Sequence, residues 1–423
     1  MTTHPQHAVT SSLDGALPLT RRHLLASVGL AAGVGLLGAR PAAAAVAPAR
    51  TVAATARPGL LHTAADLARA RDRVAAGAQP WLAGWDRLVA NGRSHADWQP
   101  RPLETVIRGG DGQNYAQLYP DIHAAYQNAL RWHVSGDEAH GAAAARILNA
   151  WSSTLTTVTG NADRFLAAGI YGYQFANAAE LVRDRGDVDH GALVAMLENA
   201  FLPLNEDFLA NHNGAVITNY WANWDLCSMA SMLAIGILAE RADLVERAVD
   251  YFHHGAGNGS LAHATPYVYP EEGLAQWQES GRDQGHTVMG IGLMGAFCEM
   301  AWNQGIDCYG ADDNRFLKGA EYVARYNLGH DVPFTDYTWQ SGPITTAPHV
   351  GWQTHTEISA ASRGQARPVW ELVLGHYTGR RGLDAPWVRQ MAESVRAEGG
   401  GGDYGTTSGG YDQLGFGTLT YYR

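Results

Sequence analysis

Cysteine and lysine are the scarcest informative residues in this chain of 423 residues. The sequence has three cysteines, and a single lysine stands among its 30 basic residues. Without a Cys-x-x-Cys pair or a Cys/His metal spacing, the sequence excludes a disulfide framework and a cysteine zinc site. We therefore expect all three thiols to be buried: Cys227, Cys298 and Cys308.

Charged residues are also few. They make up 17% of the chain against 46% for hydrophobic residues, a balance that excludes a disordered protein. The formal net charge is −11 and no long basic run is present, so a general nucleic-acid binder, which needs a basic face, is excluded. Apart from one short apolar segment near the N-terminus, no run suggests a membrane span.

The N-terminus has the features of an export signal. Arg21 and Arg22 precede an apolar run over 24–37, and an alanine-rich stretch follows. This order is typical of a secretory signal, and the arginine pair favours the twin-arginine type. We expect a signal peptide over residues 1–45, a linker over 46–58, and a secreted protein with no membrane segment after cleavage.

Strict alternation of apolar and polar residues, the pattern of half-buried strands, is nearly absent. Helical spacing recurs instead, with capping residues such as Thr63 and Asp137 and an opening Pro80. Consecutive antiparallel helix hairpins predict an all-α fold, an α/α toroid or barrel, as a single domain over 59–423. The expected helices cover 64–76, 119–134, 140–151, 165–182, 190–209, 219–240, 244–253, 284–303, 314–328, 367–376 and 386–397.

Three long segments separate these helices and carry many aromatic and histidine residues. They cover roughly 96–117, 254–282 and 329–365. Long loops in a compact domain are usually functional or disordered, and this composition argues for function.

A first polar group surrounds the start of the helix predicted over 219–240. Asn219 and Asn223 are four residues apart, so a helix beginning here would place both on one face. Free N–H groups and the helix dipole favour an anion at this end, and a substrate carboxylate could lie there. Capping and internal polar packing explain the same residues equally well. Asn211-His212, just upstream, is a second amide and imidazole pair.

A second group precedes the helix predicted over 284–303. Arg282 and His286 are four residues apart, and Glu279 or Asp283 could hold either side chain in place. Arginine can bind a carboxylate through two parallel hydrogen bonds, and histidine can transfer protons near neutral pH. A purely structural ion-pair cluster is the alternative. Further along, Tyr337 could act as an acid or base, or could be a stacked core tyrosine.

Other chemistries find less support. No HExxH zinc motif and no GxSxG nucleophile motif is present. We expect no cofactor, although the sequence leaves a structural divalent cation open. Glycoside hydrolysis needs two carboxylates at a set separation, and four acidic residues could supply such a pair: Glu271, Glu272, Glu279 and Asp283.

Two segments carry a resemblance to known enzymes. Alginate-lyase-like polysaccharide lyases have a signature similar to residues 277–286, Trp-Gln-Glu-Ser-Gly-Arg-Asp-Gln-Gly-His, and to the continuation over 299–309. The stretches 223–225 and 314–322 look similar too. The resemblance covers roughly 60–420 and is specific over 219–330. It implies an α/α toroid, secretion, and β-elimination on a uronic-acid polysaccharide such as alginate or glucuronan.

The resemblance also implies roles for particular residues. Asn223, with Asn219 beside it, resembles the group that neutralises the substrate carboxylate. His286 resembles the base and Arg282 a carboxylate anchor, while Tyr337 is a further acid or base. Additional substrate contacts are expected from Trp224, Trp277 and Gln284.

One departure from the family pattern keeps a rival arrangement open. The better-known alginate lyases have an Asn-Asn-His run where this chain has Tyr220-Trp221. Asn211-His212, with Tyr267 or Tyr269, could therefore form the site instead. The expected partner is an anionic polysaccharide and the expected state a monomer. The alternatives are a glycoside hydrolase on the same fold and a non-catalytic polysaccharide-binding protein.

Overall fold

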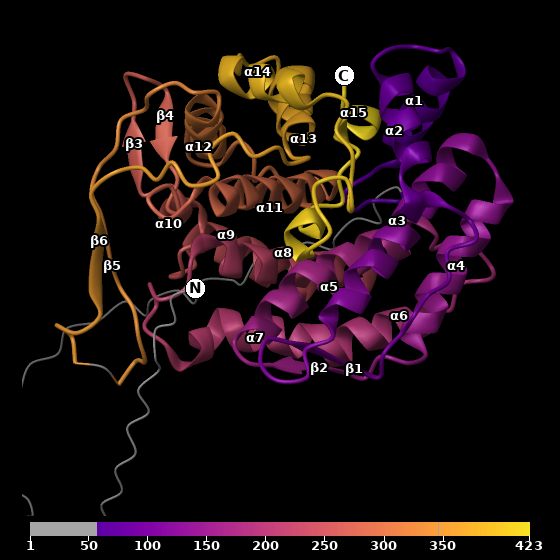
Figure 1. Cartoon of the computed structure of the whole chain (residues 1–423), viewed down its shortest axis with the longest axis horizontal. Coiled ribbons are helices and arrows are strands. Elements are labelled where there is room, and N and C mark those ends of the chain that lie inside the picture. The colour runs from indigo at the N-terminus through magenta and orange to yellow at the C-terminus, as the bar shows by residue number, and fades with distance from the viewer. Residues whose placement is uncertain (1–56, 346) are drawn as a thin grey trace, which may run out of the picture. The chain divides into compact units, whose positions relative to one another are not determined.

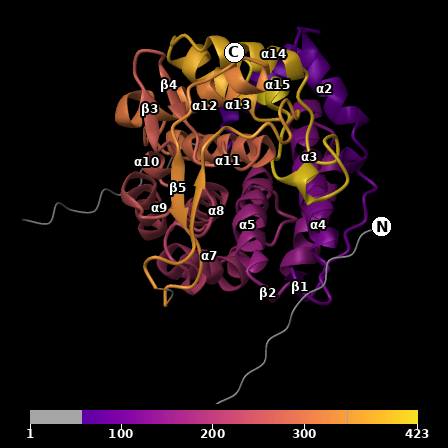
Figure 2. The ribbon, with the colours of Figure 1, turned by 60° about the vertical axis from the view of Figure 1, so that its left-hand side comes forward.

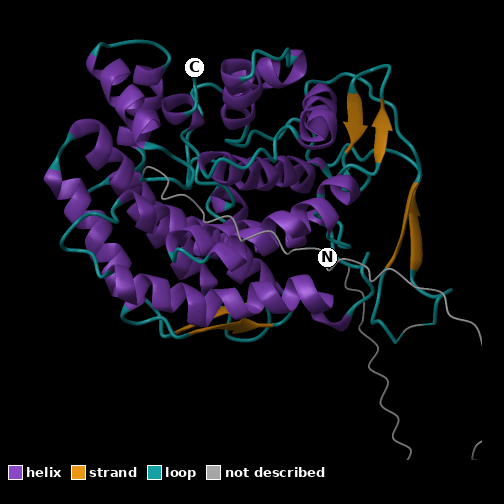
Figure 3. Cartoon of the chain, turned by 180° about the vertical axis from the view of Figure 1, so that it is seen from behind, coloured by secondary structure: helices purple, strands orange, loops and turns teal. Residues whose placement is uncertain are grey.

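The structure, a computed structural model, describes residues 57–345 and 347–423. The proposed signal peptide and most of the proposed linker lie outside these residues. In the described part, helices dominate and the strands are short and peripheral (Figures 1 and 3). The helices are α1 Ala64–Ala75, α2 Trp81–Ala90, α3 Leu118–Ser135, α4 Glu138–Ser152, α5 Asp163–Leu181, α6 His190–Met196, α7 Leu202–Asn211, α8 Ala222–Leu238, α9 Ala242–His254, α10 Leu261–Ala264, α11 Gln284–Asn303, α12 Ala311–Asn327, α13 Trp370–Leu374, α14 Pro386–Val395 and α15 Gly417–Thr420.

The strands form three separate two-stranded sheets. β1 (Thr105–Arg108) and β2 (Thr157–Gly160) pair in parallel, with Val106 opposite Val158. β3 (Tyr267–Tyr269) pairs antiparallel with β4 (Leu274–Gln276). β5 (Tyr337–Gln340) pairs antiparallel with β6 (Trp352–His355), placing Tyr337 opposite His355. The last two sheets occupy the segments that the sequence analysis assigned to long loops.

Local signals in the sequence explain most helix boundaries. Thr63 caps α1 through a capping box with Asp66, and Asp137 caps α4 by accepting a hydrogen bond from the backbone of Ala139. The prediction for 284–303 is confirmed residue by residue. The single helix predicted over 190–209 is divided, because a π-helical turn over Leu197–Phe201 separates α6 from α7.

The inner helix α8 packs against both α5 and α11, and strand β5 lies in front of it in the view of Figure 2. Side-chain contacts give the relative direction of these three helices. A side chain at Gly169 of α5 would clash with Cys227 of α8, and one at Gly172 would clash with Ser231. Because the residue numbers of the two helices increase in the same direction along this contact, α5 and α8 are parallel and closely packed. α11 follows the same direction, since Asn223 contacts Met289 near the start of α8 and α11, while Asn177 contacts Met300 near the end of α5 and α11.

All three cysteines are buried and unbridged, as predicted, and burial raises the pKa of Cys227 to about 12. The helices described here include none that is long and apolar enough to cross a membrane. The fold class is an all-α toroid, as the sequence predicted, and its core includes α5, α8 and α11, in which nearly every residue is buried.

Candidate active site

The candidate site lies where α8 and α11 begin. Trp221 is the N-cap of α8, and Asp283 is the N-cap of α11. The Asp283 carboxylate accepts a hydrogen bond of 2.8 Å from the backbone N–H of His286. Two adjacent helix N-termini direct the positive ends of their dipoles toward this place, an arrangement that favours an anionic ligand.

Arg282 lies immediately before α11 and is held from three sides. Its Nη1 donates to Glu279 Oε1 at 2.9 Å, and its Nη2 donates to His286 Nε2 at 3.1 Å. The guanidinium also lies over the ring of Trp221, 5.2 Å from the centroid. The side chain remains 25% exposed. Arg282 is therefore fixed in direction and still accessible to a ligand.

His286 is neutral in this arrangement. Arginine can only donate hydrogen bonds, so Nε2 of His286 must be the acceptor. The proton is then on Nδ1, which donates to Asp283 Oδ2 at 2.7 Å. Asp283 fixes this tautomer, and the ring, whose side chain is 40% exposed, presents its lone pair toward Arg282.

Glu279 lies beneath Arg282 and is fully buried. Its Oε1 accepts the hydrogen bond from Arg282, whereas its buried Oε2 has no hydrogen-bond partner within the described residues. Burial raises the pKa of Glu279 to about 7, and the positive charge of Arg282 opposes this shift. The sequence analysis predicted that Glu279 or Asp283 could hold Arg282 or His286. The structure confirms this, since Glu279 holds Arg282 and Asp283 holds His286.

Asn223 lies in the first turn of α8 and is 3% exposed. Among the described residues, its Nδ2 has one long contact, 3.9 Å, to the sulfur of Met289. Its Oδ1 is buried without a partner in the part of the chain that the structure describes. Buried amides are normally hydrogen-bonded, so this one is unusual and is available to a ligand that enters the site.

Tyr337 reaches the site from β5. Its hydroxyl accepts a hydrogen bond from Gln278 Nε2 at 3.0 Å and donates to Asn258 Oδ1 at 3.3 Å. Gln278 in turn accepts from the backbone N–H of Ala222, the first residue of α8. Burial raises the pKa of Tyr337 to about 12, so the phenol is protonated at neutral pH.

An aromatic wall continues from Tyr337 along the inner face of the β5–β6 hairpin. Trp339 is stacked on His355 with ring centroids 4.6 Å apart and contacts Trp221 at 5.0 Å. His355 packs so closely against Gly281 that a side chain there would collide with it. The hairpin thus joins the segment that carries Arg282 to the start of α8.

The placement of Asn219 corrects one expectation. The helix does not begin at Asn219 but at Ala222, because Trp221 has an extended backbone and the chain turns at Val216, whose carbonyl accepts from Asn219 N at 2.9 Å. Asn219 and Asn223 are therefore not on one helical face. The Asn219 side chain accepts from the backbone N–H of Gly342 at 2.8 Å and so fastens the hairpin.

Three expected substrate contacts lie in packed surroundings. Trp277 is fully buried, with its ring against Gly290 and Gly319. Gln284 is buried and bonded to Ser280, Ser359 and Asn327. Neither side chain offers surface to a sugar. Trp224 is half-buried in an aromatic cluster with Phe208 and Tyr220.

The rival arrangement does not assemble. His212 is buried, bonded to Asp225 at 2.8 Å and close to the hydroxyl of Tyr251 at 3.2 Å. Asn211 bonds Asp207 on the surface. Tyr267 donates to the carbonyl of Asp336, and Tyr269 to Gln276. These residues hold helices and loops together and do not converge on one point.

Sequence reasoning missed two members of the site. Gln278 lies within the 277–286 signature, and its position beside Glu279 was a usable signal. Asn258 gave no signal, because its partner Tyr337 lies 79 residues later in the sequence.

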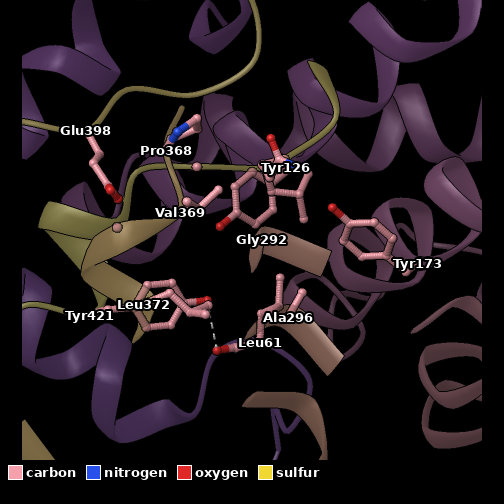
Figure 4. A pocket seen from close by; sticks show the side chains of 14 residues that line it. Leu61, Tyr126, Tyr173, Gly292, Ala296, Pro368, Val369, Leu372, Glu398 and Tyr421 are labelled. Carbon is pink, nitrogen blue, oxygen red and sulfur yellow. Dashed lines mark hydrogen bonds between the residues drawn. The ribbon is translucent and has the colours of Figure 1, made fainter. Parts of the chain in front are cut away.

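A cavity in the core lies apart from this site. Tyr126, Tyr173, Gly292 and Ala296 line it, with Glu398 at its margin (Figure 4). It contains none of the predicted site residues. Glu398 is fully buried, and burial next to Glu371 raises its pKa to about 8.

No group of three or more His, Cys, Asp or Glu in the ranges 57–345 and 347–423 could hold a metal ion. The expectation that the protein needs no cofactor stays a prediction.

Comparison with known proteins identifies the family. Residues 91–332, more than half of the chain, match the family described as alginate lyase. No curated protein shows significant sequence similarity to the chain. Among solved structures, alginate lyase A1-III from Sphingomonas species A1 is 15% identical, with a TM-score of 0.53. A histidine-to-alanine variant of alginate lyase A1-III in complex with a tetrasaccharide is 14% identical, with a TM-score of 0.55.

Each of these two similarities covers 88% of this chain and 98% of the other. At such low identity they establish the fold, while the family match rests on the sequence itself. The chain therefore belongs to the alginate lyase family and is a polysaccharide lyase with a helical toroid fold.

Proposed function

We propose that the enzyme cleaves a uronic-acid polysaccharide, alginate or glucuronan, by β-elimination. The observation that carries this proposal is Arg282, a guanidinium fixed by Glu279 and His286 yet accessible at the N-termini of α8 and α11. Such a group suits a sugar carboxylate. Support also comes from the tetrasaccharide bound to two variants of alginate lyase A1-III.

The first chemical demand is stabilisation of charge. The C5 proton of a uronate is weakly acidic, because its removal spreads negative charge onto a carboxylate that is already charged. Arg282 binds this carboxylate. The amide of Asn223, which has no oxygen or nitrogen partner among the residues that the structure describes, donates to it as the enolate-like intermediate forms. Because the Asn223 amide can donate to the carboxylate without breaking an existing hydrogen bond, it is preorganised to stabilise the intermediate.

The second demand is movement of protons. His286 holds a lone pair at Nε2, which Arg282 occupies while the site is empty. A uronate carboxylate that binds Arg282 competes for the same N–H and releases the lone pair to accept the C5 proton. Tyr337, kept protonated by its raised pKa, donates a proton to the leaving glycosidic oxygen.

A glycoside hydrolase finds less support from the same residues. Glu279 is buried beneath Arg282, and Asp283 is committed to His286 and the helix cap. Glu272 is bonded to Arg325 at 2.7 Å. Because these three carboxylates are engaged in other contacts, they do not form the pair that would have to flank a glycosidic bond in a hydrolase.

We further propose that the protein is exported through its twin-arginine signal and acts as a monomer on its polymeric substrate outside the cell. Export can be tested by following a fusion in which Arg21 and Arg22 are both replaced by lysine.

The deciding experiment is incubation of the purified protein with glucuronan, alginate and hyaluronan while the ultraviolet absorbance of the unsaturated uronate is followed. A rise on alginate or glucuronan is expected. New reducing ends without that absorbance would identify a hydrolase, and binding by calorimetry without any product would identify a binding protein.

A further inference from the structure

The carboxylate of Glu279 shares Arg282 with the substrate that the proposed function assigns to it. Glu279 is fully buried, and within the described residues its one hydrogen bond comes from Arg282 Nη1 at 2.9 Å. Its second oxygen is buried with no partner in the described structure. A buried carboxylate bonded through one oxygen depends on the charge of its single partner.

Several charged and titratable groups around Glu279 share the positive charge of its partner Arg282. Asp283 and His286 face it from the start of α11, Tyr337 faces it from β5, and His355 of β6 packs against Gly281 nearby. When Glu279 is ionised, the single positive charge of Arg282 faces two negative charges, on Glu279 and Asp283. A bound uronate adds a third negative charge beside the same guanidinium.

We propose that Glu279 takes up a proton when a uronate carboxylate binds Arg282, so that the guanidinium exchanges one carboxylate partner for another. This inference rests on the proposed function and extends it to a positioning residue beneath the substrate site. The proton comes from solvent and is returned when the product leaves.

The geometry selects Glu279 over Asp283 as the proton acceptor. Asp283 accepts two hydrogen bonds from His286, at 2.8 and 2.7 Å, and these bonds contribute to holding its pKa below the usual range. In the described structure Glu279 accepts one hydrogen bond, and its second oxygen is buried without a partner. Burial already raises its pKa to about 7. Loss of part of the Arg282 interaction raises that pKa further.

The exchange has two consequences for catalysis. Once Glu279 is neutral, Arg282 has one fewer negative neighbour, and the Asp283 carboxylate, 3.5 Å from its Nε, is the acidic group that still shares its charge with the substrate. The charge of Glu279 also contributes to the raised pKa of Tyr337, so protonation of Glu279 makes the Tyr337 phenol a stronger acid as substrate binds. Both effects act through other residues, so Glu279 positions and tunes the site without touching the substrate.

The test is stopped-flow mixing of enzyme with a glucuronan or alginate tetrasaccharide at pH 8 in weak buffer with a pH indicator. β-Elimination consumes no net proton, because the C5 proton is removed while the leaving oxygen gains one. Uptake therefore reports binding even during turnover. With a free-enzyme pKa of about 7, about 90% of Glu279 is ionised at pH 8, so uptake approaching one proton per site is expected.

Glu279→Gln should abolish the uptake and flatten the pH dependence of binding, whereas the apparent dissociation constant of the wild type should rise up to about tenfold per pH unit above pH 7. Glu272→Gln, a change at an exposed glutamate outside the site, is the matched control and should behave like wild type. Melting curves establish that each variant is folded.

Two results would overturn the inference: tetrasaccharide binding by the wild type without proton uptake, or uptake that persists in Glu279→Gln and so belongs to His286 or another group. If Glu279→Gln does not fold, infrared difference spectra of the wild type decide, since ligand should create a protonated-carboxyl band. A protein that binds no uronate at all refutes the proposed function itself, which is a distinguishable failure.

Discussion

Replacement of Asn223 by alanine should separate catalysis from folding. In the free protein the Asn223 amide makes only a 3.9 Å contact to the sulfur of Met289, and its oxygen is unpaired in the described structure. The change therefore removes no ordinary hydrogen bond from the folded state. The remaining loss is a small cavity in the first turn of α8, which we expect to lower the free energy of unfolding by about 1 kcal/mol.

The expected loss of activity is much larger. If Asn223 donates to the carboxylate as negative charge develops, its removal should cost about 2.7–4 kcal/mol in the barrier, a fall of about 10²–10³ in rate. The fall should appear mainly in kcat, because the donor acts more strongly in the transition state than in the ground state. Single-turnover absorbance measurements and melting curves on the same preparations give both quantities.

Asn219→Ala is the matched control. Its side chain accepts from the backbone of Gly342, so this variant should loosen the β5–β6 hairpin and have a milder effect on kcat. The reasoning about Asn223 is refuted if Asn223→Ala melts several degrees lower while the rate of the folded fraction stays near that of the wild type.

Three further predictions concern the neighbouring groups. Arg282→Lys keeps the charge but loses the planar fork, so kcat/KM on the polymer should fall at least tenfold; an unaltered value would remove Arg282 from the site. His286→Ala should remove the acidic limb of the pH–rate profile if its neutral ring is the base; if the limb remains and Tyr337→Phe is the inactive variant, Tyr337 serves as both base and acid. Glu398→Gln should stabilise the protein at pH 8 but not at pH 5 in thermal melts. The pKa of Glu398 in the folded protein, about 8, lies above its unfolded value near 4.5, so the free energy of unfolding falls by up to about 4–5 kcal/mol as pH rises from the lower to the higher value. Equal melting shifts at both pH values would contradict this.

The sequence was most informative where structure is decided locally. The boundaries of α11 follow from Asp283, a capping residue, and from a largely apolar stretch over 288–302, interrupted by Glu299, after which Asn303 ends the helix. The same segment placed Arg282, Glu279, Asp283 and His286 close together, because residues three or four apart meet at a helix start.

Prediction failed where a distant segment decides the local conformation. Asn219 was expected on the first turn of α8, yet its side chain is bonded to Gly342, 123 residues away, and the helix begins three residues later. The surroundings of Tyr337 are also non-local, since Gln278 and Asn258 lie 59 and 79 residues before it. Trp277 is a residue type on which sugars commonly stack. The packing of α11 and α12 around its ring shows that it belongs to the core instead.

If the substrate is the polyanion proposed above, the electrostatic field at the site of this acidic protein must differ in sign from the net charge of −11. The parallel direction of α5, α8 and α11 gathers the positive ends of three helix dipoles at one rim, where Arg282 adds a full charge. The hairpin that covers this rim adds no repulsion, because residues 337–356 contain no aspartate or glutamate. The two acidic residues that do lie in the site are each committed, Glu279 to Arg282 and Asp283 to His286. Attraction of the proposed anionic substrate should therefore depend on how completely these carboxylates are neutralised, so the proposed protonation of Glu279 should strengthen binding.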